Sequence, residues 1–173
     1  MKKRMISTAR TLCLTFSLLC TGAGAADSGA RQEAIQALGI LSGSDNLTSQ
    51  VTRAQFAQML VAASAYKDSA EGYGSSLFKD LKGDHWASGY VRIAIEQGWM
   101  TGYVDGAFRP DRAVTLEEGC AALLKVLGYD PSTLKGAYPA AQLAKAGSVG
   151  LLDGVSAKPG GGLTRQDCVE LFY

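Results

Sequence analysis

The sequence has few of the residues on which metal sites and acid–base catalysts depend: its 173 residues include one histidine and four cysteines. Four cysteines are too few for a disulfide-dense scaffold, and a four-coordinate zinc site would need carboxylate ligands as well. An excess of one charge is also lacking, because 17 Lys and Arg face 16 Asp and Glu. No basic surplus therefore indicates nucleic-acid binding. Four prolines exclude a proline-rich tract, whereas 47% hydrophobic residues are enough for a buried core.

Catalytic motifs are missing too. The sequence contains no nucleophile elbow, no glycine-rich phosphate loop and no set of residues for a histidine-based triad. Calcium binding at Asp105-Gly106 is not favoured, because Thr101 and Tyr103 stand where an EF-hand loop has acidic or amide ligands. The single histidine, His85, is interpreted as structural. We therefore predict no enzyme activity, no metal and no cofactor within this chain.

The longest apolar run is confined to the N-terminal end. Basic residues at positions 2, 3, 4 and 10 precede an apolar run from Thr11 to Cys20, and small residues follow up to Ala26. This order predicts a secretory signal peptide over residues 1–26. The run is about ten residues long, whereas a membrane-spanning helix needs roughly 20. A lipid anchor on Cys20 is the weaker alternative, because Leu19 stands where a small residue normally precedes a lipidated cysteine.

Cleavage there would leave two cysteines, Cys120 and Cys168, in an exported protein in which oxidation is permitted. Both follow a threonine that is predicted to begin a helix, but at distances that differ by one residue. Two buried free thiols are therefore favoured over a disulfide, which stays an open alternative.

One short pattern occurs three times: glycine, two apolar residues, any residue, glycine. It reads GILSG at 39–43, GWMTG at 98–102 and GLLDG at 150–154. Each copy is followed by an apolar residue and a threonine, which are Val51-Thr52, Val114-Thr115 and Leu163-Thr164. Recurrence at similar spacing indicates an internal repeat.

Each threonine has the sequence context of a helix start. Gln55, Glu118 and Asp167 stand three residues after the respective threonines, as in a capping box. Apolar residues with helical spacing follow each box, and Gly128 with Pro131 ends the middle helix. A second helix is predicted ahead of each glycine pair, most clearly over 87–97. The predicted fold is mostly α.

The middle unit carries a family resemblance. It reads FKD at 78–80, HWA at 85–87, GYVDGAFRP at 102–110 and VTLEE at 114–118. This segment resembles an S-layer homology repeat. We predict a signal peptide (1–26), a shortened first repeat (27–67), a linker (68–77), a close second repeat (78–129) and a degenerate third repeat (130–173). The resemblance implies three helix-loop-helix repeats that form a pseudo-threefold, three-pronged bundle with grooves between the prongs.

The resemblance also implies a ligand: a secondary cell-wall polysaccharide, attached to peptidoglycan and carrying pyruvate ketals. Its carboxylate would meet the arginine of the Thr-Arg-Ala-Glu motif, a place that Arg53 and Arg165 occupy here. Helix-terminal amides and a guanidinium both suit such an anion. The middle copy has Leu116 instead, so its anion contact is in question. Further candidate contacts are Trp86, Tyr138, Asp80, Tyr103, Asp105 and Gly106.

The predicted function is noncovalent anchoring at the bacterial cell envelope, in the cell wall or S-layer. One alternative is that the chain is the anchoring N-terminal part of a longer surface enzyme or S-layer protein with a fused C-terminal domain. The second alternative is a protein-interaction scaffold that has lost glycan binding. No nucleic-acid partner and no transmembrane segment in the mature chain are predicted.

Overall fold

The structure is a computed structural model that describes residues 28–43, 46–70 and 77–173. The predicted signal peptide and part of the predicted linker lie outside the described residues. The described residues form helices joined by loops, with isolated β-bridges and no strands, which confirms the mostly α prediction. The helices are α1 (Ser28–Ala37), α2 (Arg53–Ala62), α3 (Ser88–Glu96), α4 (Leu116–Val126), the 3-10 turn η1 (Pro131–Thr133), α5 (Ala140–Ser148) and α6 (Arg165–Phe172).

All three predicted capping boxes are present. The hydroxyls of Thr52, Thr115 and Thr164 each accept a hydrogen bond from the amide three residues later, at the starts of α2, α4 and α6. The side-chain oxygen three residues on accepts a hydrogen bond from the backbone amide of the threonine. These bonds satisfy amides that lack a partner at a helix start. The sequence pattern therefore locates these three helix starts to the residue.

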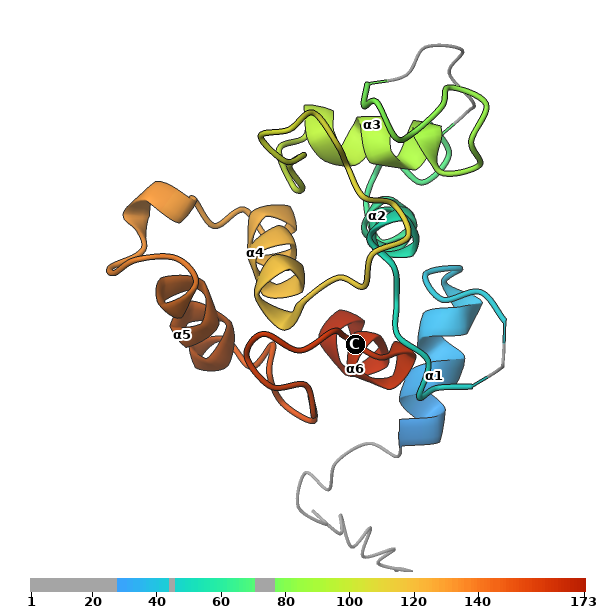
Figure 1. The fold of residues 1–173 in the computed structure, drawn as a ribbon. Helices are drawn as coiled ribbons and strands as arrows, with labels where there is room; N and C mark the ends of the chain where they lie inside the picture. The colour runs from blue at the N-terminus through green and yellow to red at the C-terminus, as the bar shows by residue number, and fades with distance from the viewer. Residues whose placement is uncertain (1–27, 44–45, 71–76) are drawn as a thin grey trace, which may run out of the picture.

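The helices pack in three pairs, which Figure 1 shows as three separate groups. α2 packs against α3, α4 packs against α5, and α6 returns to pack against α1. The third pair joins the first and last described helices. The Arg31–Glu170 ion pair spans that contact and links residues 139 positions apart in the sequence.

Three backbone hydrogen bonds connect the groups in a closed cycle. The amide of Val51 donates to the carbonyl of Leu163 (2.9 Å), that of Leu163 to Val114 (2.9 Å), and that of Val114 back to Val51 (3.0 Å). We call Val51, Val114 and Leu163 the hub. All three side chains are fully buried, so these amides have no water to bind and need one another.

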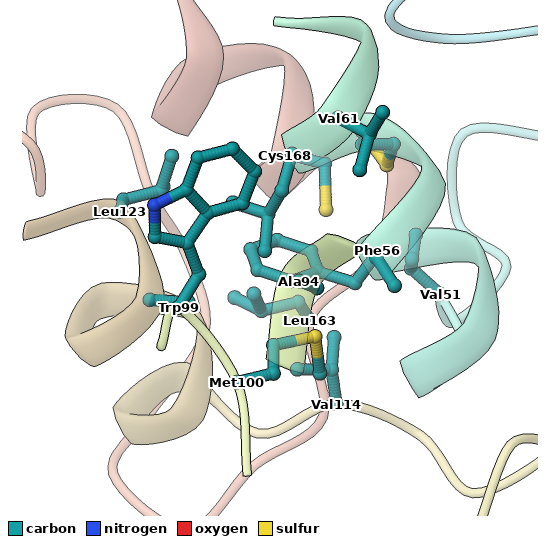
Figure 2. Close-up of a cluster of buried hydrophobic side chains, with 14 of the residues drawn as sticks. Val51, Phe56, Val61, Ala94, Trp99, Met100, Val114, Leu123, Leu163 and Cys168 are labelled. Atoms are coloured by element: carbon teal, nitrogen blue, oxygen red, sulfur yellow. The ribbon is translucent and has the colours of Figure 1, made fainter. Parts of the chain in front are cut away.

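The hydrophobic core surrounds the hub, as the close-up in Figure 2 shows for Val51, Phe56, Val114, Leu163 and residues around them. Gly119 in α4 lies against this core. A Cβ atom at Gly119 would come within 2.6 Å of Leu163 Cδ1, closer than real Cβ contacts. The absence of a side chain at Gly119 therefore leaves the space that the Leu163 side chain fills.

Cys120 and Cys168 are free and buried, so the structure has the thiol alternative and not the disulfide. Burial raises the pKa of Cys120 to about 12 and raises the pKa of Cys168 as well. Because only the thiolate attacks electrophiles, both thiols are expected to be unreactive in the folded protein.

We expect iodoacetamide at pH 8 to label neither Cys120 nor Cys168 in the native protein and to label both after denaturation in urea. Mass spectrometry of peptides from the two samples measures the labelled fraction of each cysteine. Native labelling at the rate of the denatured chain, or a mass lower by two hydrogens, would contradict this expectation.

Candidate ligand-binding grooves

One groove lies between the N-terminus of α2, the loop after α3 and the facing sides of α4 and α5. It has a volume of about 400 Å³, and we call it the Arg53 groove. Three α-helices, the 3-10 turn η1 and two loop segments thus contribute to one cavity. Its lining residues are Arg53, Trp99, Met100, Thr101, Gly102, Tyr103, Glu118, Ala121, Lys125, Pro131, Tyr138 and Gln142.

Arg53 is almost completely committed to the protein. The residue is 3% exposed. Its Nε donates to the carbonyl of Phe108 (2.8 Å), its Nη2 to the carbonyl of Thr101 (2.7 Å), and its Nη1 lies 3.1 Å from a carboxylate oxygen of Glu118. The rings of Tyr103 and Phe108 lie 4.9 and 4.6 Å from the guanidinium carbon. Arg53 therefore ties α2 to the loop after α3, which explains a cation at a helix N-terminus.

Glu118 compensates the positive charges of this region. Its Oε1 accepts from the Tyr103 hydroxyl (3.0 Å) and from Arg112 Nη1 (2.9 Å), while Oε2 accepts from the Thr115 amide (3.0 Å). Burial opposes ionisation, but the Thr115 amide and the charges of Arg53 and Arg112 outweigh it and lower the pKa of Glu118. The carboxylate is thus ionised at neutral pH.

Asp80, Asp105 and Gly106 shape the loop after α3 and do not line the groove. Asp80 accepts hydrogen bonds from the amides of Phe108 and Arg109, both at 2.8 Å. Asp105 accepts from the Ala107 amide, and Gly106 has a φ of +80°, which favours glycine. Of the four candidates around this loop, the structure brings only Tyr103 into the groove.

A smaller groove of about 110 Å³ lies at the N-terminus of α6, and we call it the Arg165 groove. Arg165 Nη2 donates to the carbonyl oxygens of Ser42 and Gly43. Arg165 Nε is buried and has no hydrogen-bond partner among the described residues. The groove is lined by Ile40, Leu41, Ser42, Val51, Gln55, Gln58, Met59, Trp86 and Arg165.

The two grooves are built from corresponding residues. Arg53 and Arg165 each follow a capping threonine, and Glu118 and Gln55 each hold the third position of a capped helix. Tyr138 and Trp86, 58% and 54% exposed, contribute the aromatic rings. The correspondence supports the sequence-based grouping of the two arginines and the two aromatic residues.

Each arginine contacts the glycine loop of a unit other than the one that contains it. Arg53 contacts the 98–102 loop of the middle unit, and Arg165 contacts the 39–43 loop of the first. The sequence analysis instead assigned each arginine to the unit that contains it. The anion contact of the middle unit was therefore in question, because that unit has Leu116 at this position. In the structure the middle unit has Arg53, and the amide of Leu116 donates to the carbonyl of Gly161 in the last unit.

The 150–154 loop, the third copy of the glycine pattern, packs against a side chain of α6. Leu116, which follows its capping threonine as Arg53 and Arg165 follow theirs, is buried. Glu170 pairs with Arg31, and a Cβ atom at Gly154 would come within 2.9 Å of Glu170 Oε2. The carboxylate therefore packs directly against the loop.

Sequence reasoning missed Trp99, Lys125 and Gln142 as groove residues and recognised Glu118 only as a capping residue. Of these residues, only Trp99 had a sequence signal that could have indicated a groove position, because it lies inside the repeated GWMTG pattern. His85 accepts a hydrogen bond from the Ala87 amide (3.1 Å), in line with a structural role. Among the described helices, none has both the length and the apolar character to cross a bilayer.

Comparison with known proteins finds similarity to cell-wall and cell-surface proteins. The chain is 29% identical over 143 residues to the "Middle cell wall protein" of Brevibacillus brevis, which covers 80% of this chain and 13% of that protein. It is 27% identical to the "Surface layer protein" of Brevibacillus choshinensis, over 70% of this chain and 11% of that protein. It is 36% identical to the "Cellulosome-anchoring protein" of Acetivibrio thermocellus, over 44% of this chain and 17% of that protein.

The matched region thus spans less than a fifth of each of these relatives. Residues 77–118 match the family model of the S-layer homology domain. This segment holds α3, the 98–102 loop and the start of α4, and so contributes one wall of the Arg53 groove. The chain therefore contains a segment, residues 77–118, that matches the S-layer homology domain.

Proposed function

We propose that this chain is a non-catalytic anchor that holds a protein at the bacterial cell envelope by binding an anionic cell-wall polysaccharide. The observation that carries the proposal is the recurrence of one groove design, with an arginine at a helix start facing an exposed aromatic ring. A guanidinium suits a carboxylate, and an exposed ring suits the apolar face of a sugar. The printed names of the relatives, as cell-wall, surface-layer and anchoring proteins, support the same location.

Three copies of one helix-loop-helix repeat, one of them matching the family model, would account for two grooves of the same design. Pyruvate ketals are the proposed anionic groups. The arginine of the Arg165 groove is the better placed to bind them, because its Nε has no hydrogen-bond partner among the described residues, whereas all three nitrogens of Arg53 have one. The greater length of the relatives is compatible with a fused domain that this anchor would hold at the surface.

Binding to cell walls tests this function. The purified chain is expected to sediment with sacculi that retain their secondary polymer, and to stay in the supernatant when hydrofluoric acid has removed that polymer. Arg165→Ala is expected to weaken binding about tenfold, which corresponds to about 1.4 kcal/mol. Lys158→Ala, a change of an exposed lysine away from both grooves, is the matched control. Equal sedimentation with and without the polymer contradicts the proposal.

A further inference from the structure

The Arg53 groove contains a cation that the interactions described so far leave without a counter-ion. Lys125 lies in the last turn of α4, and its ammonium donates to the carbonyl of Gly98 at 2.8 Å. An ammonium has three N–H donors, so two remain for another partner. No carboxylate of the described residues lies within salt-bridge distance of this Nζ. Partial burial lowers the pKa of Lys125, as expected when nothing nearby compensates its charge.

Arg53 is poorly placed to receive a charged ligand in the same groove. Its side chain is only 4% exposed, and each of its three nitrogens already faces a protein oxygen. An incoming carboxylate would also meet Glu118, which lies 3.1 Å from the guanidinium. Lys125 lines the cavity and faces no such competition.

A second group in this groove also lacks a partner. Gln142 is 9% exposed, lines the cavity, and has a side-chain oxygen without a hydrogen bond. A buried amide without a partner is costly and indicates that a ligand or a small rearrangement supplies one. Rotation of this amide toward the cavity would offer an acceptor to a sugar hydroxyl or N-acetyl N–H.

We propose that Lys125, and not Arg53, binds the carboxylate of the ligand in the Arg53 groove, with Gln142 hydrogen-bonding the same sugar and Arg53 acting as a positioning residue. This inference rests on the proposed function and specifies its chemistry: an acidic sugar with a hydrogen-bond donor next to the charged group. The Arg165 groove has Ala62 at the place of Lys125, so the two grooves read the charge with different side chains.

The chain has two tryptophans, and one lines each groove. Trp99 lines the Arg53 groove, and Trp86 lines the Arg165 groove. Their indole N–H signals in a ¹H–¹⁵N spectrum therefore report the two grooves separately. The probes are the methyl glucoside that carries a 4,6-pyruvate ketal and the uncharged methyl glucoside. We expect the charged probe to shift the Trp99 signal with at least tenfold higher affinity than the uncharged probe.

In Lys125→Gln this charge preference at Trp99 is expected to disappear, while the Trp86 titration stays as in the parent chain and shows that the fold is intact. Gln142→Leu is expected to weaken both probes at Trp99 about threefold to tenfold. Lys158→Gln serves as the matched control. The proposal is overturned if Lys125→Gln leaves the ratio of the two affinities at Trp99 unchanged. It is also overturned if the charged probe does not shift the Trp99 signal of the parent chain. Failure to bind sacculi is a different result, and it overturns the proposed function.

Discussion

Replacing Asp167 by alanine is expected to lower the free energy of unfolding by about 3 kcal/mol, the upper end of the range for leaving partly buried donors without their acceptor. Asp167 is 1% exposed. Its Oδ1 accepts from the amide and hydroxyl of Ser156 and from the Ala157 amide, and its Oδ2 accepts from the amide and hydroxyl of Thr164. Alanine would take the acceptor away from all these donors, several of which are half-buried, and lost acceptors at partly buried donors are costly.

The effect should depend on pH. Burial alone would raise the pKa of Asp167, but hydrogen bonds from Thr164 and Ser156 outweigh burial and lower it. A lowered folded-state pKa adds stability above the unfolded value of about 3.9, and this stability is lost as the pH falls through the folded pKa. The difference between parent and Asp167→Ala is therefore largest near pH 7 and narrows below about pH 4.

Urea denaturation followed by circular dichroism at pH 7 and at pH 3 measures both effects. Asp153→Ala is the matched control, because this carboxylate is exposed in the 150–154 loop. A loss below about 1 kcal/mol for Asp167→Ala, similar to that of a surface substitution, would contradict the role of the carboxylate as a buried acceptor.

Arg53→Ala is expected to cost a similar amount, about 3–5 kcal/mol, for a different reason. The substitution removes donors to the carbonyls of Thr101 and Phe108 and one of the two arginines that face Glu118. Arg53→Lys keeps the charge but not the planar fork, so it is expected to recover less than half of the loss.

Arg112→Ala is the matched comparison, because Arg112 pairs with the same carboxylate but has a side chain that is 40% exposed. Its loss should stay near 1 kcal/mol or less. Thermal denaturation of the three variants ranks them. Equal stability of Arg53→Ala and Arg112→Ala would show that the buried contacts of Arg53 add little, and would return Arg53 to the role of a ligand contact.

Local features of this protein could be predicted from sequence, because they depend on residues a few positions apart. The three capping threonines are examples, since each meets a partner three residues later. The grooves could not be assembled in this way. Arg53 reaches Thr101 over 48 positions, and Arg165 reaches Ser42 over 123. No spacing rule links such residues, so assigning each arginine to its own unit was the natural error.

The roles of Asp80 and Lys125 show the same limit. Asp80 was expected to contact the glycan, but its carboxylate accepts hydrogen bonds from two amides 28 and 29 positions away. In the sequence, Lys125 is an ordinary basic residue in the last turn of a helix, where its positive charge interacts favourably with the helix dipole. Only the fold shows that its ammonium enters a groove in which every carboxylate is already paired.

The cyclic hydrogen bonds of the hub have a consequence for biosynthesis. Because Val51 and Val114 both depend on Leu163, and α1 packs on α6, early parts of the chain cannot reach their final contacts until late parts have been translated. Contacts of such long range slow folding. The apolar face of α1 and the hub residue Val51 therefore lack their final partners until α6 and Leu163 have been translated.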